Sequence, residues 1–254
     1  MSANSSSAKN SRLANENFAL FGTGWIMITW TFANLAFVPT VVRVLYALGV
    51  PVKAWLETKN TIAIALIDFS YAPVVFGLIL LLYVPYVRRR GQSLRSLVGL
   101  ERGPRFKDVL YGVPSYVGYF FLSLALALVA TTFVPAINLQ EVQNLGINQP
   151  TSLIEYVMVF VMLVIVPPLL EELLFRGFLL GTLLRGFAWP VAAVVTSLLF
   201  GVAHGQVNLF LDTFALSLVL CYLRYKTGSL WAGVILHALK NLIAFVLLYV
   251  VGAK

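Results

Sequence analysis

Long apolar runs separated by short polar segments fill most of this 254-residue chain. This feature constrains the fold more than any other. Apolar residues and their breakers place the runs at about 18–42, 61–86, 109–134, 153–186, 189–205, 208–224 and 229–251. A helix needs roughly 20 apolar residues to cross a bilayer. Only 11% of the residues are charged, against about 25% in soluble domains. The sequence therefore predicts an all-α polytopic membrane bundle of about seven to eight transmembrane helices.

The apolar runs divide the chain into three parts. Residues 1–17 are polar and rich in Ser and Asn, which predicts a disordered tail. Residues 18–152 predict the N-terminal transmembrane helices, and residues 153–251 predict a C-terminal transmembrane core. The run 153–186 is too long for a simple span, since it would cover roughly 50 Å as a helix. Pro167 and Pro168 predict that it is kinked or split into two helices.

The net charge of +8 does not indicate nucleic-acid binding, because the basic residues gather between apolar runs. Seven Lys and Arg lie in 87–108, and none lies in 135–152. Since cytoplasmic loops of membrane proteins are enriched in Lys and Arg, the first segment and the N-terminus are predicted to be cytoplasmic. Arg43, Lys53 and Lys59 run against this rule, because they would lie in an outside loop.

Three charged residues, Glu171, Glu172 and Arg176, interrupt the apolar run "IVPPLLEELLFR". A charge near the bilayer centre costs at least ~2.5–3.5 kcal/mol, so each needs a reason. Glu172 and Arg176 are four residues apart and share a helix face, which predicts an ion pair with a structural role. Glu171 is turned about 100° away and has no basic partner at that spacing. The sequence thus predicts one paired carboxylate and one free carboxylate.

Two further polar motifs are predicted to reach the depth of Glu171. Counted from a turn at 186–190, Glu171 and His204 each lie about 21 Å along antiparallel helices. Counted from the next turn, Asn241 reaches nearly the same depth, and His237 lies about one turn below it. Three motifs distant in sequence are therefore predicted to converge on one buried layer.

The layer predicts hydrolysis by activated water, because it offers no obvious nucleophile. Glu171 and His204 could activate the water and pass its proton to a leaving amine. His237 and Asn241, four residues apart, could donate hydrogen bonds to an oxyanion. Phe200 is expected to pack beneath the imidazole of His204. Separately, Asp212 is expected to cap a helix start.

The segments "EELLFR", "FGVAH" and "HALKN" resemble the three motifs of the CPBP family of intramembrane endopeptidases, also called the CAAX-protease and bacteriocin-processing (Abi) family. The patterns Glu-Glu-x-x-x-Arg, Phe-x-x-x-His and His-x-x-x-Asn occur in order over about 165–245. The resemblance implies a conical catalytic core within 153–251. The family's eukaryotic members cut three residues from prenylated CAAX proteins, and some bacterial members are tied to bacteriocin immunity.

The resemblance also implies roles for single residues. Glu171 would be the general base, assisted by His204, and His237 with Asn241 would form the oxyanion site. Glu172 and Arg176 would support the first helix. The chain departs from the family at Ala232 and Gly233, where a proline is common. The residue at which the helix of His237 starts is therefore not predicted. The implied setting is a bacterial cell membrane, and the implied partners are lipid and a protein or peptide substrate whose lipidation is left open.

Two alternatives remain open from the residues. In the first, Glu171, His204 and His237 bind zinc, with water as a fourth ligand. The sequence has no His-Glu-x-x-His helix and only one cysteine, Cys221, so a mechanism without a cofactor is preferred. In the second, the layer belongs to a transporter or to an immunity or scaffold protein, and it binds a partner without catalysis.

Overall fold

The computed structural model describes the whole chain except residues 1, 58–69, 90, 92, 134–149 and 253–254. Every regular element among the described residues is helical, as predicted. The α-helices are α1 (Ser2–Phe32), α2 (Val38–Ala47), α3 (Val52–Glu57), α5 (Tyr71–Arg89), α6 (Leu94–Val98), α7 (Phe106–Phe133), α8 (Leu153–Phe160), α9 (Val166–Glu171), α10 (Leu180–Leu183), α11 (Trp189–Ala203), α12 (Val207–Thr227) and α13 (Trp231–Phe245). Four π-helical segments adjoin them, at Ala33–Phe37, Val161–Ile165, Glu172–Leu179 and Val246–Val251.

Five helical runs within the described residues are long and apolar enough to cross a membrane: Ser11–Ala47, Ala72–Arg89, Phe106–Phe133, Leu153–Leu183 and Trp231–Val251. They coincide with five of the seven predicted spans, although residues 61–69 of the second prediction lie outside the described part. The other two predicted spans are helices as well. Of these, α11 is apolar but shorter than the five runs above. α12 is long enough, but it carries three charged residues, Asp212, Arg224 and Lys226. The protein is an integral membrane protein built from a helix bundle.

Residues 2–17 are helical, which differs from the predicted disordered tail. They form the first half of α1, continuous with its apolar second half. Arg12 and Glu16 pair four residues apart at 2.9 Å, an arrangement that supports a helix. An apolar helix that is already formed extends by adding one residue at a time, which avoids the cost of a new nucleus.

Pro167 and Pro168 were predicted to kink the run 153–186 or to split it into two helices, and the split does not occur. The chain stays helical from Leu153 to Leu183, and the two prolines occupy the start of α9. A proline lacks the N–H group that donates to an earlier carbonyl in the helix. A π-helical segment directly before α9 changes the hydrogen-bonding pattern there, so the run continues past the prolines.

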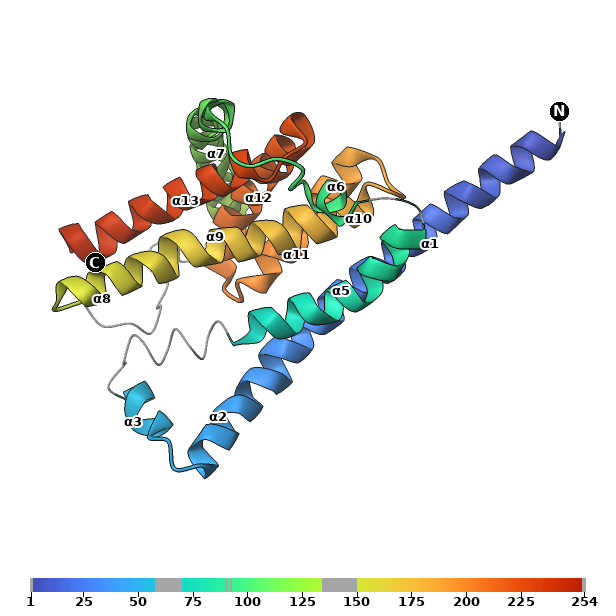
Figure 1. The fold of residues 1–254 in the computed structure, drawn as a ribbon. Coiled ribbons are helices and arrows are strands. Elements are labelled where there is room, and N and C mark those ends of the chain that lie inside the picture. The colour runs from blue at the N-terminus through green and yellow to red at the C-terminus, as the bar shows by residue number, and fades with distance from the viewer. Residues whose placement is uncertain (1, 58–69, 90, 92, 134–149, 253–254) are drawn as a thin grey trace.

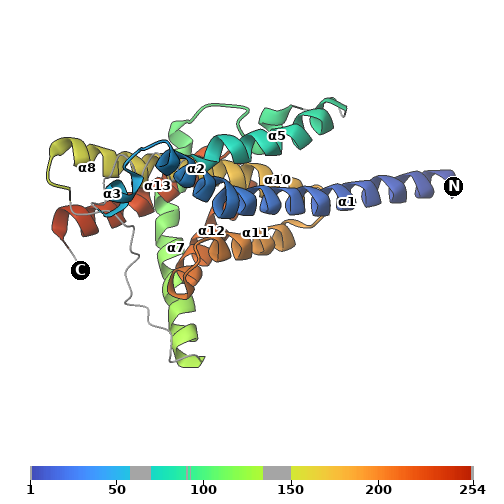
Figure 2. The same cartoon turned by 90° about the horizontal axis from the view of Figure 1, so that it is seen from below.

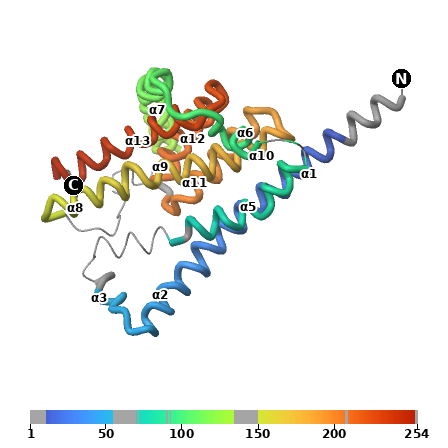
Figure 3. Tube along the Cα trace, viewed as in Figure 1, coloured from blue at the N-terminus to red at the C-terminus, as the bar shows by residue number. Residues whose placement is uncertain are grey.

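The helices pack in two groups. Figure 1 shows α13 lying alongside the continuous run of α8, α9 and α10. α2 extends the line of α1, and the chain returns in α5 beside α1 (Figure 3). Aromatic and aliphatic side chains from α1, α5 and the segment Glu172–Leu179 form the largest core, and Tyr83 hydrogen-bonds Thr182 across it. Seen from below, α7 crosses the bundle steeply (Figure 2), and it packs on α12 and α13.

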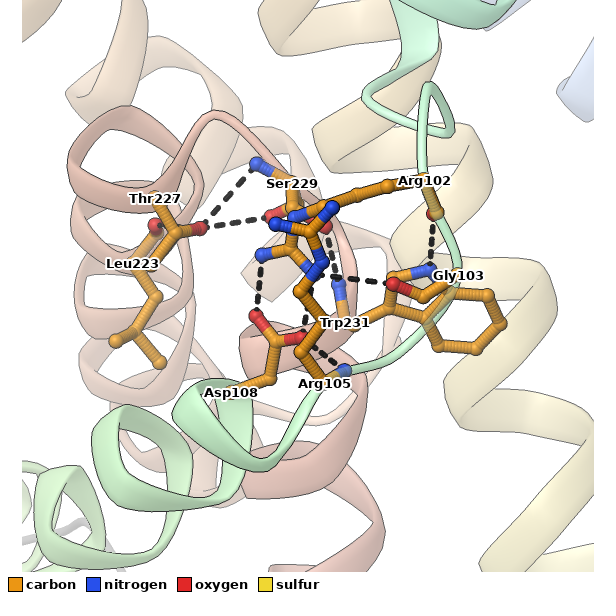
Figure 4. Close-up of polar contacts among 8 residues, drawn as sticks. All are labelled: Arg102, Gly103, Arg105, Asp108, Leu223, Thr227, Ser229 and Trp231. Carbon is orange, nitrogen blue, oxygen red and sulfur yellow. Dashed lines mark hydrogen bonds and ion pairs between the residues drawn. The ribbon is translucent and has the colours of Figure 1, made fainter.

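A buried carboxylate fixes the start of α7 against the start of α13 (Figure 4). Both oxygens of Asp108 accept hydrogen bonds from Arg102, each 2.7 Å long, and Oδ2 also accepts from the backbone N–H of Arg105. These bonds raise the pKa of Arg102 above its ordinary value, so the guanidinium keeps its charge. The indole of Trp231 donates to the carbonyl of Arg102 at 2.8 Å.

The loop before α13 completes this contact. Thr227 accepts a hydrogen bond from the N–H of Ser229, and the hydroxyl of Ser229 accepts one from the N–H of Trp231. The N–H of Leu230 donates to the carbonyl of Gly99 at 3.1 Å. The helix start that the sequence left open at Ala232 and Gly233 is thus Trp231, where α13 begins without a proline.

Gly112 allows α7 to cross α13 closely. A Cβ atom at this position would lie 2.7 Å from the backbone oxygen of Ala232, whereas one at Gly118 would have no neighbour within 4 Å. We expect Gly112→Ala to lower the free energy of unfolding by about 1–3 kcal/mol, as overpacking does. Gly118→Ala in the same helix should be neutral or stabilising by up to about 1 kcal/mol. Thermal unfolding of both variants in detergent tests this, and equal shifts would contradict it.

Candidate active site

A buried network joins the first and third motifs. Nη1 of Arg176 lies 3.0 Å from Oε1 of Glu172, and both side chains are buried. The predicted ion pair is therefore confirmed. The same Oε1 atom lies 3.1 Å from Nδ1 of His237 on α13. One carboxylate oxygen thus links an arginine of its own helix with a histidine 65 positions later.

The aromatic ring of Phe200 packs against several side chains of this network. Its ring centroid lies 4.7 Å from that of His204 and 6.0 Å from that of His237, edge-on in both cases. The guanidinium of Arg176 lies 4.3 Å from the same centroid, within the range of a cation–π contact. The predicted packing of Phe200 beneath the His204 imidazole is confirmed, and the ring also contacts the other two motifs.

Glu171 faces His237 from the other side of the imidazole. Oε2 of Glu171 lies 3.9 Å from Nε2 of His237, which is longer than a hydrogen bond. Among the described residues, this Oε2 atom is buried and has no hydrogen-bond partner. About a quarter of the Glu171 side chain is exposed, whereas that of Glu172 is 1% exposed. Glu172 is thus paired with Arg176, and Glu171 has no arginine or lysine partner on its own helix, as the helix spacing predicts.

His204 ends α11 as its C-terminal cap, and Gly205 follows in the left-handed region with φ +69°. Nδ1 of His204 lies 2.8 Å from the carbonyl oxygen of Phe200. Because a carbonyl oxygen only accepts, Nδ1 carries the proton, and the lone pair of a neutral ring then lies on Nε2. Phe200, which packs against this imidazole, also faces the ring of His237 and the guanidinium of Arg176. All three motifs therefore meet.

Asn241 lies at a different depth from the one predicted. It is His237 that lies level with the two glutamates, and Nδ2 of Asn241 donates to the carbonyl of Leu163 at 2.9 Å. In a regular helix, the backbone N–H of a residue four or five positions later donates to such a carbonyl. For Leu163 these positions are prolines, which have no N–H, so the carbonyl is left for Asn241. Counting residues from the turns misses this register, because it assumes ideal α-helices, and the run contains π-helical segments.

Gly233 is a residue of this site that sequence reasoning did not assign. A Cβ atom there would lie 2.9 Å from Oε2 of Glu172. The glycine therefore lets α13 approach closely enough for His237 to reach Glu172. The sequence shows that Gly233 stands where the family commonly has a proline. It does not show that Glu172 packs against this position, which is why a small residue is needed there.

Asp212 does not cap α12, in contrast to the prediction. This helix begins at Val207, and Gln206 caps it without a side-chain hydrogen bond. Instead, Oδ1 of Asp212 accepts from the hydroxyls of Tyr119 at 2.5 Å and Ser123 at 2.8 Å, and Oδ2 pairs with Lys240 at 3.5 Å. Tyr119 and Ser123 lie four residues apart in an apolar helix, and this spacing was the sequence signal for a polar contact on that face.

The zinc alternative, like the mechanism without a cofactor, stays a prediction. Within the described part of the chain, no three His, Cys, Asp or Glu side chains are grouped so as to hold a metal ion, and Glu171, His204 and His237 all belong to that part. Nδ1 of His237 is already engaged by Glu172. The fold and the site thus define a helical integral membrane protein with a buried layer of carboxylates and imidazoles.

Comparisons with known proteins agree with this class. Residues 153–243 match the family model described as type II CAAX prenyl endopeptidase Rce1-like, which confirms the resemblance that the three motifs predict. The chain is similar to an "Uncharacterized 24.3 kDa protein" of Escherichia coli, with 32% identity over 48% of this chain and 54% of that one. It is also similar to the "Putative membrane peptidase YdiL" of Bacillus subtilis, with 29% identity over 30% of this chain and 32% of that one.

The matched segments therefore span about half and about a third of these relatives. No solved structure matches the chain significantly.

Proposed function

We propose that the protein is an intramembrane endopeptidase that hydrolyses a peptide bond of a membrane-associated protein or peptide with activated water. The observation that carries this proposal is the pair of glutamates around His237, one bonded and one not. Glu171 is the general base, because its Oε2 atom is free to take a proton from water. The Rce1-like match over the same residues supports a peptidase similar to the CAAX proteases.

His204 assists Glu171 in this mechanism. With its proton fixed on Nδ1 by the Phe200 carbonyl, the ring presents the Nε2 lone pair. This lone pair accepts a hydrogen bond from the attacking water, and the ring can then carry the proton toward the leaving amine. Phe200 holds the imidazole from below.

His237 stabilises the oxyanion that forms when water attacks. Its Nδ1–H donates to Glu172, so a hydrogen bond from Nε2 to the oxyanion requires a ring that carries a proton on both nitrogens. A charged donor of this kind forms stronger hydrogen bonds to an oxyanion than a neutral one does. The amide of Asn241 has two N–H donors, and the bond to Leu163 uses one of them, so the second can serve the same oxyanion.

The test compares membrane peptides from cells that contain the protein with those from cells that lack it. We expect new chain termini, in the membrane fraction only, whenever the protein is present. Purified protein should reproduce one of these cleavages at an unchanged rate after treatment with a zinc chelator. Loss of cleavage on chelation and recovery with zinc would favour the metalloprotease, and identical termini in both cells would favour a scaffold or immunity protein. The predicted cytoplasmic N-terminus and bacterial membrane remain predictions.

A further inference from the structure

Several buried polar atoms in the core beside the candidate active site have no hydrogen-bond partner among the described residues. They are Oε2 of Glu172, Nε and Nη2 of Arg176, Oγ1 of Thr196 and Oγ of Ser217. All four side chains are fully buried. A buried polar group without a partner is costly, and a charged one more so. Native proteins satisfy such groups with ordered water or an ion where no side chain reaches them.

Thr196 lies on the face of α11 that meets Arg176. It is four residues before Phe200, so both side chains project from one face of the helix, and both are fully buried. The guanidinium of Arg176 lies 4.3 Å from the centroid of the Phe200 ring, and α11 packs against the segment Glu172–Leu179. The hydroxyl of Thr196 therefore belongs to the same part of the core as the guanidinium.

Ser217 lies on the face of α12 that meets Glu172. Leu220, three residues later on that face, has its Cδ2 atom 3.5 Å from the position of a Cβ atom on Gly233. Oε2 of Glu172 lies 2.9 Å from the same position. Since α12 also packs along α11, the two hydroxyls and the ion pair share one core between four helical segments.

Thr196 and Ser217 differ from other hydroxyl side chains of the bundle. The hydroxyl of Thr213 donates to the carbonyl of Leu209 at 2.7 Å, and Thr182 likewise bonds a carbonyl of its own helix. This bond is the usual partner of a hydroxyl in an apolar helix. Within the part of the chain that the structure describes, Thr196 and Ser217 make none, so their hydroxyls are available to a ligand in the core.

We propose that this core is an internal binding site for water, formed by Glu172, Arg176, Thr196 and Ser217. The Glu172 carboxylate already pairs with Arg176 at 3.0 Å and disfavours an anion, and the guanidinium disfavours a cation. Water can donate to Oε2 and accept from the guanidinium. Each buried water makes roughly three hydrogen bonds, so about two of them satisfy these atoms. The inference does not depend on the proposed peptidase activity.

A crystal structure of the purified full-length protein, grown with bromide in place of chloride, tests the occupant. We expect an ordered density peak about 2.7–3.2 Å from Nε or Nη2 of Arg176 and from one of the two hydroxyls, without anomalous signal from bromide. An anomalous peak at this place would show an anion and overturn the proposal. Direct bonds among the four side chains, with no peak between them, would overturn it too.

The sign of a stability change tests the same site independently. Thr196→Val and Ser217→Ala each remove a hydroxyl with little change of shape. If the hydroxyl bonds water, each substitution should lower the thermal midpoint of unfolding in detergent by about 2–6 °C. A raised midpoint, which the loss of an unsatisfied hydroxyl from a dry core predicts, would contradict the proposal.

The double variant shows whether the two hydroxyls share one water cluster. Because the first substitution already disrupts the cluster, we expect Thr196→Val/Ser217→Ala to lower the midpoint by less than the sum of the single shifts. Thr213→Val is the control, because the Thr213 hydroxyl bonds its own helix, and its shift should add to that of Thr196→Val. Full additivity in both pairs would rule out a shared site.

Discussion

Glu171→Gln should lower the rate of peptide hydrolysis by about 10³-fold, within the range that a general base contributes. Glutamine keeps the size of the side chain but cannot take a proton from water. The Oε2 atom of Glu171 makes no hydrogen bond among the described residues and lies 3.9 Å from Nε2 of His237, so the thermal midpoint of unfolding should change little. Both quantities can be measured on the purified variant, with the peptide whose cleavage depends on the protein.

Glu155→Gln is the matched control for this substitution. Glu155 lies in the same continuous helical run, and its exposed carboxylate bonds Thr151 near the start of α8. Its replacement should leave the hydrolysis rate unchanged. If Glu171→Gln retains more than about a tenth of the wild-type rate, Glu171 is not the general base.

Arg176→Ala should lower the free energy of unfolding by about 3–5 kcal/mol, because it leaves the Glu172 carboxylate buried without its cation. The substitution also removes the guanidinium from the face of Phe200. Denaturation of the purified protein in detergent would show the loss as a lower midpoint, and expression in the membrane should fall with it.

Arg12→Ala provides the comparison. Arg12 and Glu16 also pair four residues apart, at 2.9 Å, but the arginine side chain is 81% exposed. Exposed pairs contribute about 0–1 kcal/mol, so this substitution should have almost no effect on stability. If the two arginine variants unfolded alike, the buried network would not support the site.

Local spacing was sufficient to predict part of the site. Residues four apart on a helix face each other whatever surrounds them, so the Glu172–Arg176 pair and the packing of Phe200 under His204 follow from the sequence. The free state of Glu171 follows in the same way. The order of the three motifs further predicted that they meet, since successive antiparallel helices bring their polar residues together.

Distances between helices could not be predicted in this way. The carboxylate that His237 bonds, and the carbonyl that Asn241 bonds, depend on the register of α13 against the run Leu153–Leu183. That register depends on the close approach at Gly233, the Asp108 contact and the π-helical segments. The cluster of Tyr119, Ser123 and Lys240 around Asp212 likewise joins helices that are distant in sequence.

The sequence by itself determined that this is a helical membrane protein with polar motifs in its C-terminal apolar runs. Hydrophobicity and helical periodicity depend on neighbouring residues, so they can be read directly from the chain. Only the tertiary structure decided which atoms of those motifs touch, because a shift of one residue between two packed helices moves a side chain by about 1.5 Å along the axis and turns it by about 100°. Hydrogen bonds tolerate far less displacement than that.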